Sequence, residues 1–217
     1  MKVNSAKFFW RGCCLRGGMR GKMERDFYAM MSRMKYIERW ALMRNSMKEN
    51  ISEHSLEVSM LAHALAVIGN RRYGKNLDAK KAALIGLYHD ATEIITGDMP
   101  TPIKYYNASI QGAFKDIENK AARQLLSMLP EELRPDYEAI FFPEESEEYI
   151  CRLVKAADKL SALIKCIEEE KAGNTEFRSA KETITAALHG MGLVEAEDFM
   201  REFLPAYGKT LDELGMV

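Results

Sequence analysis

Apolar residues recur at three- and four-residue spacing along most of this 217-residue chain, which is the period of one face of an α-helix. Alternating runs of Val, Ile and Thr bounded by tight-turn residues, which would indicate β-strands, are nearly absent. The pattern predicts an all-α fold, a helical bundle that forms a single domain. The predicted helices span about residues 24–37, 50–74, 78–97, 108–128, 146–172, 175–189 and 195–204.

Two of these helices carry clear end signals. Asn50 can cap one helix, with Glu53 three residues later as in a capping box. Asp78 can cap the next, which we expect to continue to a C-terminal glycine at Gly97. The segment 97–102 is predicted to be non-helical, because its two prolines restrict their own backbones and those of the residues before them.

The apolar stripes of two helices follow from the same spacing. In the helix 50–74 the apolar residues are Leu56, Met60, Ala64, Val67 and Ile68. In the helix 146–172 one inward stripe contains Ile150, Val154, Ala157, Ser161 and Ile164.

Charge divides the chain into two unlike parts. The whole sequence has 31 basic and 32 acidic residues, but residues 1–22 contain six basic residues and no acidic one, so the remainder has a net charge of −7. We expect residues 1–22 to be a basic N-terminal extension outside the fold and residues 23–217 to form the domain. A basic tail that contacts a partner is the functional alternative. The acidic domain argues against binding of nucleic-acid polymers and is compatible with a cation or one small anion.

Cysteine usage and hydropathy indicate the compartment. Cys151 and Cys166 fall in one predicted helix, roughly 22 Å apart at ~1.5 Å per residue, so they form no natural disulfide. A reducing cytoplasm is the expected location. The longest apolar run, residues 58–68, is interrupted by His63 and is too short to cross a membrane.

Four ionisable residues fall where the pattern expects core positions. His89 and Asp90 stand side by side in the otherwise apolar segment 82–95, Asp158 lies on the inward stripe of a long helix, and His54 lies in the first turn of another. Burial of such groups is costly without a partner, and one metal ion would be a partner for all four. The alternative is that each is a core polar group satisfied by hydrogen bonds.

Two imidazoles and two carboxylates form a nitrogen and oxygen donor set. This set suits a divalent transition metal such as Mn²⁺, Co²⁺, Fe²⁺, Ni²⁺ or Zn²⁺, and it suits Ca²⁺ poorly. Four protein ligands would leave positions open on an octahedral ion for water and a substrate oxygen. Glu93, four residues after His89, is predicted to lie one turn along on the same helix face.

The order of these four residues resembles the H…HD…D signature of the HD-domain metal-dependent phosphohydrolases, which are all-helical. From about residue 24 to the C-terminus, the flanking sequence is similar to the bacterial 5′-deoxynucleotidases of the YfbR type. The segments that carry this second resemblance are residues 38–45 (ERWALMRN), 49–56 (ENISEHSL), 88–104 (YHDATEIITGDMPTPIK), 153–160 (LVKAADKL), 165–166 (KC) and 172–174 (AGN).

The resemblance implies hydrolysis of 2′-deoxyribonucleoside 5′-monophosphates to deoxynucleoside and phosphate, by a metal-dependent cytoplasmic homodimer with the HD-domain fold. The implied ligands of the divalent cation, Co²⁺, Mn²⁺ or a similar metal, are His54, His89, Asp90 and Asp158. The residues that would bind substrate are Arg39, Trp40, His54, Asp98, Lys104 and Asp158.

Individual roles follow from side-chain chemistry. Glu93 and Asp98 are both candidates for the catalytic acid or base, and the sequence does not rank them. Arg39 offers a forked cation for the phosphate, and Lys104 is a weaker candidate for the same task. Trp40 would form a wall against the sugar that excludes a 2′-hydroxyl. The structural alternatives are a surface ion pair for the arginine and a core anchor for the tryptophan.

Two other functions remain open at this point. One is another HD-type phosphohydrolase, such as a cyclic-nucleotide or alarmone phosphodiesterase. The other is a non-catalytic helical module in which the same cluster holds a structural metal, and in which Glu93 and Asp98 would be dispensable. The native metal, the base preference and the surface of the dimer are not indicated by the sequence.

Overall fold

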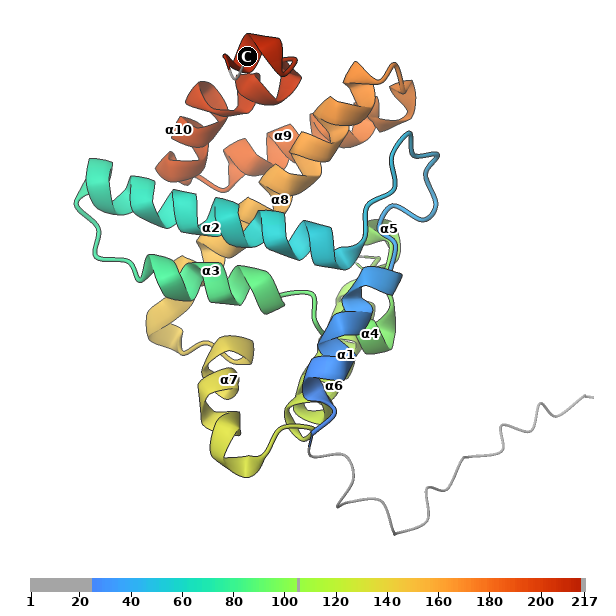
Figure 1. Ribbon diagram of the computed structural model, residues 1–217, viewed down its shortest axis with the longest axis vertical. Helices are drawn as coiled ribbons and strands as arrows, with labels where there is room; N and C mark the ends of the chain where they lie inside the picture. Colours follow the sequence, from blue (N-terminus) through green and yellow to red (C-terminus); the bar gives the residue numbers. More distant parts are fainter. Residues whose placement is uncertain (1–24, 105, 216–217) are drawn as a thin grey trace, which may run out of the picture.

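The structure, a computed structural model, describes residues 25–104 and 106–215, and in this part of the chain the regular elements are helices (Figure 1). The predicted all-α class is confirmed, whereas the predicted basic extension 1–22 lies outside the described residues. The longer helices are α2 (Ile51–Tyr73), α3 (Ala79–Tyr88), α6 (Ala108–Leu126), α8 (Glu148–Lys171), α9 (Arg178–Gly190) and α10 (Val194–Glu202). The shorter α-helices are α1 (Phe27–Met31), α4 (Glu93–Thr96), α5 (Thr101–Lys104) and α7 (Arg134–Phe141). Short 3₁₀ helices span Ser32–Tyr36, Glu131–Leu133, Glu145–Glu147, Thr175–Phe177, Leu204–Gly208 and Asp212–Leu214.

Helices α2, α3 and α8 form the centre of the molecule. Helix α2 lies along α3 and crosses α8, and α9 packs on the far part of α8 (Figure 1). The main core between them is built from fully buried aliphatic residues, among them Val58, Leu65, Leu153 and Leu160. A second cluster joins α1 to α6 and includes Ala91, in the turn after α3.

Gly86 allows α3 to approach α2 closely. A Cβ atom at this position would lie 3.0 Å from Ser59 Cα and 3.1 Å from Val58 O. Such contacts are tighter than most Cβ atoms make, and the atoms here are backbone, so a larger residue would push the two helices slightly apart. The close approach brings the C-terminal end of α3 next to the N-terminal part of α2.

The predicted start of α2 is confirmed in detail. The Asn50 side chain accepts hydrogen bonds from the backbone of Ser52 and Glu53, and the Glu53 side chain bonds back to the Asn50 backbone, which completes a capping box. Asp78 caps α3 by accepting from Lys81 N at 2.9 Å. Gly97 follows α4 with φ of 73°, which favours glycine at a helix end.

The prediction of one helix over residues 78–97 is wrong. Helix α3 ends at Tyr88, a four-residue turn follows, and α4 begins at Glu93. The backbone tightens to i→i+3 bonds here, from Ala91 N to the carbonyl of Tyr88 and from Glu93 N to that of Asp90, while His89 Nδ1 bonds to the carbonyl of residue 86. Glu93 therefore does not continue the helix face of His89.

The prediction that segment 97–102 is non-helical is also wrong at its end, because α5 begins at Thr101. Proline is tolerated in the first turn of a helix, where its missing N–H has no intrahelical acceptor. Helix α7 was not predicted, and Pro135 occupies its first turn in the same way. The predicted helix 24–37 is a short α-helix that continues as a 3₁₀ helix.

The predicted apolar stripe of α2 is wrong for three of its five residues: Ile68 is buried in the core and Ala64 packs against it, but the others are exposed. Leu56, Met60 and Val67 expose 55%, 58% and 37% of their surface, and α2 buries Val58 and Leu61 instead. A helix with apolar residues on several faces leaves the inward face undetermined by spacing alone. The stripe predicted for α8 is confirmed, since all five of its residues are buried. None of the described helices combines the length and the apolar character needed to cross a membrane.

Candidate functional site

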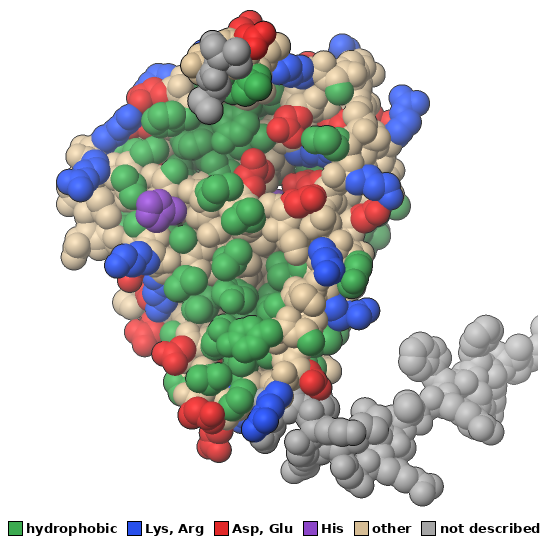
Figure 2. Space-filling view, in the orientation of Figure 1, with side chains coloured by type: hydrophobic (Ala, Val, Ile, Leu, Met, Phe, Trp, Pro, Cys, Tyr) green, Lys and Arg blue, Asp and Glu red, His purple; other side chains and the backbone are tan. Residues whose placement is uncertain are grey.

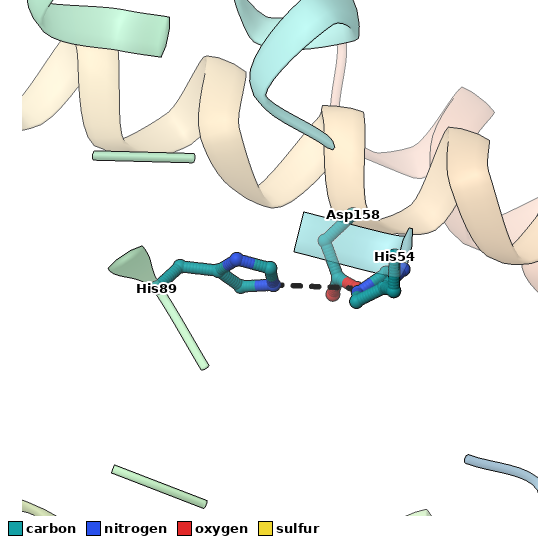
Figure 3. A group of neighbouring side chains, drawn as sticks. All are labelled: His54, His89 and Asp158. Carbon is teal, nitrogen blue, oxygen red and sulfur yellow. Dashed lines mark ion pairs between the residues drawn. The ribbon is translucent and has the colours of Figure 1, made fainter. Parts of the chain in front are cut away.

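Three side chains from separate parts of the chain point toward one another (Figure 3). His54 comes from the first turn of α2, His89 from the turn after α3, and Asp158 from the middle of α8. One ligand atom from each lies within 4.8 Å of the others. Asp90 adjoins this group, with Oδ2 at 3.1 Å from His89 Nε2 and 3.5 Å from His54 Nε2. The structure thus brings together the four residues predicted to bind a metal.

The two histidines of this group each have one ring nitrogen, Nε2, that is available to bind a metal ion. His54 Nδ1 lies 2.9 Å from Ser161 Oγ, and His89 Nδ1 lies 2.7 Å from Gly86 O, to which it donates. Both Nε2 atoms are buried, and within the described residues neither has a hydrogen-bond partner. His54 Nε2 lies 3.2 Å from Asp158 Oδ1, whereas His89 Nε2 lies 3.1 Å from Asp90 Oδ2 and 4.0 Å from Asp158 Oδ1, and the side chain of Asp158 is 40% exposed. Such a donor set suits a divalent transition metal.

The charges of the site shift the pKa values of these groups. Burial, together with the charge of Arg39, lowers the pKa of His54 and favours the neutral imidazole that a ligand requires. Burial also acts to lower the pKa of His89, but Asp90 and Asp158 outweigh it and raise the pKa to about 9. Burial acts to raise the pKa of Asp158, but His54, His89 and Arg39 hold it well below its usual range. The carboxylate is therefore ionised.

Besides Asp90 and Asp158, the site contains two further carboxyl groups, those of Glu93 and Asp98. Glu93 is buried with 6% exposure, and its Oε2 has no hydrogen-bond partner in the described part of the chain. Burial, followed by the charges of Asp90 and Asp98, raises the pKa of Glu93 to about 9. Burial raises the pKa of Asp98, although Arg39 acts in the opposite direction. Both groups thus bind a proton more tightly than ordinary carboxyls do.

Arg39 and Trp40 enter the site from the segment that precedes α2. Arg39 Nη1 bonds to Glu49 Oε2 at 3.0 Å, and its Nη2 lies 3.9 Å from Asp158 Oδ1. Trp40 Nε1 bonds to the same Glu49 oxygen at 2.9 Å, and the indole packs edge-on against Phe177 with a 5.3 Å centroid separation. The side chain of Arg39 is thus 12% exposed and lies beside the candidate metal ligands, in contrast to a surface ion pair.

Lys104 makes its ion pair with a residue outside this group. Its Nζ bonds to Glu118 Oε1 at 2.8 Å and sits 4.7 Å from the centroid of the Phe114 ring. Burial acts to lower the pKa of Lys104, but Glu118, followed by Glu93 and Asp90, outweighs burial and raises it. The lysine thus contributes positive charge to the acidic side of the site while its ammonium is held by α6.

Three residues that orient the site, Glu49, Glu57 and Ser161, were not predicted as site residues from the sequence. Glu49 receives both Arg39 and Trp40, and Ser161 Oγ, which adjoins His54 Nδ1, donates to Glu57 Oε2 at 2.6 Å. A signal for Ser161 existed, because it is a polar residue on the buried stripe of α8. No periodicity signals Glu49, which lies just before the helix cap.

The comparisons with known proteins agree with this geometry. A family model described as 5′-deoxynucleotidase YfbR-like matches residues 26–207. A 5′-deoxynucleotidase of Pectobacterium atrosepticum is 49% identical over 188 residues, which cover 87% of this chain and 94% of that protein. A 5′-deoxynucleotidase of Vibrio vulnificus is 44% identical over 191 residues, which cover 88% of this chain and 98% of that protein.

Two solved structures share the fold. An HD-domain phosphohydrolase from Listeria innocua matches with a TM-score of 0.71 at 20% identity, over 84% of this chain and 88% of that chain. An HD phosphohydrolase of cyanophage S-2L, named DatZ and solved with dA and one catalytic Zn²⁺ ion, matches with a TM-score of 0.58 at 21% identity, over 84% of this chain and 96% of that chain. The predicted HD-domain fold is confirmed.

Proposed function

This chain belongs to the 5′-deoxynucleotidase YfbR-like family, and we propose that it hydrolyses 2′-deoxyribonucleoside 5′-monophosphates to deoxynucleoside and inorganic phosphate. The observation that carries this function is the pair of buried imidazole Nε2 atoms, without hydrogen-bond partners among the described residues, that face Asp90 and Asp158. Two carboxyls with raised pKa values, Glu93 and Asp98, lie in the same site. A structural metal site would require the ligands but not Glu93 and Asp98. The acid and base groups therefore favour an enzyme over a non-catalytic module.

His54, His89, Asp90 and Asp158 would hold a divalent cation, for which Co²⁺ and Mn²⁺ are the first candidates. When bound, the cation supplies polarisation of a phosphate oxygen and makes a water molecule beside it more acidic. His54 and Asp158 would then also border the phosphate. The two Nδ1 atoms bond to Ser161 Oγ and Gly86 O, and these bonds keep the Nε2 atoms directed inward.

The remaining residues move protons and hold the substrate. A water oxygen attacks phosphorus, the bond from phosphorus to the 5′-oxygen breaks, and that oxygen takes up a proton. One of Glu93 and Asp98 would accept the proton of the water or deliver one to the leaving oxygen, and their raised pKa values support this role. Arg39 retains N–H groups for the phosphate beyond its bond to Glu49, and Lys104 adds positive charge nearby.

Trp40 would lie against the deoxyribose and leave no room and no hydrogen-bond partner for a 2′-hydroxyl. Its support is the position of the indole next to Arg39, whose guanidinium carbon lies 5.7 Å from the ring centroid. A site selects against an added hydroxyl when that group would be buried without a partner. This residue is the proposed origin of the preference for deoxynucleotides.

We further propose a cytoplasmic homodimer whose domain begins near residue 23, close to the start of the family match at 26. Cys151 and Cys166 are free, which is compatible with a reducing compartment. The support for the dimer is the exposed stripe of Leu56, Met60 and Val67 on α2. Figure 2 shows hydrophobic side chains gathered over this part of the surface.

The test of the function is metal removal and replacement. The purified protein is treated with a chelator, single divalent metals are restored one at a time, and phosphate release is measured from paired substrates such as dAMP and AMP. We expect release from the deoxynucleotide and little from its ribose counterpart. Absence of release with every metal would contradict the enzyme, and cleavage of a cyclic or pyrophosphorylated nucleotide would favour another HD-type hydrolase.

A further inference from the structure

The Glu49 carboxylate occupies the point where Arg39 and Trp40 meet. The side chain is 13% exposed, and its Oε2 accepts from Arg39 Nη1 at 3.0 Å and from Trp40 Nε1 at 2.9 Å. Its second oxygen, Oε1, lies 3.7 Å from Nδ1 of His54. One carboxylate thus adjoins the proposed phosphate group, the proposed sugar wall and a histidine of the metal cluster.

The backbone reinforces this arrangement. Arg39 N donates to Glu49 O at 2.9 Å, next to the bridge between Glu38 and Asn50. The donors on Arg39 and Trp40 and the acceptor on Glu49 are therefore held by main-chain as well as side-chain bonds. The carboxylate is then positioned before substrate arrives, which lowers the entropy lost when the donors are ordered.

Trp40 needs such a restraint because its backbone is strained. Its φ of 58° lies in the left-handed region, which a residue with a large side chain avoids, and among the described residues it is the non-glycine residue with positive φ. Asn45 Nδ2 bonds to Trp40 O at 3.2 Å, and Phe177 supports the indole edge. The bond to Glu49 holds the polar end of the indole ring.

Charge gives Glu49 a second effect. The guanidinium of Arg39 lies between two carboxylates, Glu49 at 3.0 Å and Asp158 at 3.9 Å. Without Glu49, the attraction of Asp158 would be unopposed and would draw the arginine toward a proposed metal ligand. Glu49 thus keeps Arg39 apart from that ligand.

We propose that Glu49 is a positioning residue that holds Arg39 and Trp40 as one unit and thereby sets the discrimination between deoxyribose and ribose. This inference rests on the proposed function. Glu49 touches neither the phosphate nor the sugar in this proposal. Its effect on the reaction passes through the two side chains that it orients.

The experiment compares Glu49→Gln and Glu49→Ala with the wild-type protein. Glutamine keeps one acceptor for the indole but loses the charge, and alanine loses both. We expect the ratio of kcat/KM for dAMP over AMP to fall at least about tenfold in the alanine variant, with a larger rise in KM than fall in kcat, because a charged hydrogen bond is lost. Glutamine should restore part of the ratio. Bound metal, measured by elemental analysis after repurification, should stay near the wild-type content in both.

A spectroscopic arm tests the unit without turnover. The chain has two tryptophans, so in a Trp10→Phe background fluorescence reports Trp40 alone. We expect the alanine variant to shift the emission and to increase quenching by acrylamide. Glu38→Gln is the matched control, because this exposed carboxylate lies beside the same bridge and pairs with Lys48.

The outcomes separate the two proposals. An unchanged substrate ratio and unchanged quenching in both Glu49 variants, or equal changes in the Glu38 control, would overturn the role of Glu49. A wild-type protein that releases phosphate from neither nucleotide would overturn the proposed function and the selectivity with it. In that case the quenching measurement still decides whether Glu49 holds the indole. Loss of metal in the glutamine variant would assign Glu49 to the metal cluster and contradict the proposal.

Discussion

At the scale of single residues, each histidine of the site divides its two ring nitrogens between different partners. The Nδ1 atoms face Ser161 and Gly86 O, and the Nε2 atoms face the acidic cluster. Glu93 also buries one oxygen without a hydrogen-bond partner in the described residues, but burial raises its pKa to about 9, whereas burial and Arg39 lower the pKa of His54. This contrast separates residues that would bind the metal from a residue that would move protons.

Substitution should separate these two roles. His89→Ala and Asp158→Ala remove proposed ligands, so we expect both to lose bound metal and activity. Glu93→Ala should retain metal and reduce kcat by about 100-fold or more, because a positioned acid or base contributes that much. Metal content and phosphate release are measured on the same samples. His189→Ala is the control, since this exposed histidine bonds to Glu197 on α10 and should change neither quantity; loss of metal from the Glu93 variant would contradict the division of roles.

The strained backbone at Trp40 predicts that a glycine variant is more stable than an alanine variant, the reverse of the usual order in a helix. At φ of 58° alanine meets the steric penalty of the left-handed region and glycine does not, so Trp40→Gly should be about 1 kcal/mol more stable than Trp40→Ala. Urea unfolding measures the difference. Ala83, within α3, is the control, because alanine is more stable than glycine inside a helix. Ala83→Gly should therefore lose about 1 kcal/mol of unfolding free energy. Equal stability of the two position-40 variants would show that the backbone is unstrained.

At the scale of elements, the caps were more predictable than the helix breaks. The start of α2 could be predicted because Asn50 and Glu53 act within four residues of one another. The break after Tyr88 could not, because apolar spacing continues through it and because the His89 side chain bonds back to Gly86 O, a contact that spacing does not reveal. Glu49 could not be predicted for the same reason. Its role depends on contacts made across the bridge between Glu38 and Asn50, and the neighbouring sequence does not indicate them.

The cap of α2 should affect activity as well as stability. Asn50→Ala and Asn107→Ala each remove an N-cap bond and should lose about 1 kcal/mol of unfolding free energy. Only the first cap adjoins the site, between Glu49 and His54 in the sequence. We therefore expect a fall in kcat/KM for Asn50→Ala alone. Similar activities of the two variants, at equal stability, would argue against this coupling.

The contact between α8 and the segment before α2 should make stability depend on pH. Glu169, which is 1% exposed, accepts from Ser46 N at 2.8 Å, Asn174 Nδ2 at 2.8 Å and Lys165 Nζ at 2.5 Å. Burial acts to raise its pKa, but these bonds outweigh burial and lower it from 4.5 to about 2. A pKa lowered by folding stabilises the protein above pH 4.5, by about 3 kcal/mol here, and this stability is lost as the pH falls toward 2.

Glu169→Gln tests this dependence. The variant should lose about 3 kcal/mol at pH 7, because it leaves the buried ammonium of Lys165 without its ionic partner. The gap from the wild-type protein should narrow as the pH is lowered from 5 to 2 in urea-unfolding series. Glu170→Gln, which removes an exposed partner of Lys181, should change the midpoint little at any pH. A gap that is constant with pH would exclude Glu169 as the titrating group.

At the scale of the whole molecule, the exposed face of α2 is the largest departure from the predicted pattern. Leu56, Met60 and Val67 follow one another on a single stripe, and Leu84 of α3 is 43% exposed. An apolar patch on a helix face is typical of an interface. The proposed homodimer would thus explain why these apolar residues of α2 are not part of the core of the monomer.

A charge on this face should dissociate the dimer. Met60→Glu would bury an unpaired carboxylate in the interface, and we expect sedimentation velocity to show a monomer where the wild-type protein is a dimer. Lys120→Glu is the control, because this exposed residue lies on α6, which packs against α4, α5 and α7. A monomeric wild-type protein, or a dimeric Met60→Glu variant, would contradict this surface.

Helix α2 has two opposite uses. His54 and Leu56 are two residues apart on it, so their side chains project from nearly opposite sides of the helix, one toward the proposed metal site and the other outward. In a dimer joined along α2, the two catalytic centres would therefore stand back to back and open in opposite directions. Each would receive nucleotide and release product from its own side, with no shared vestibule between them.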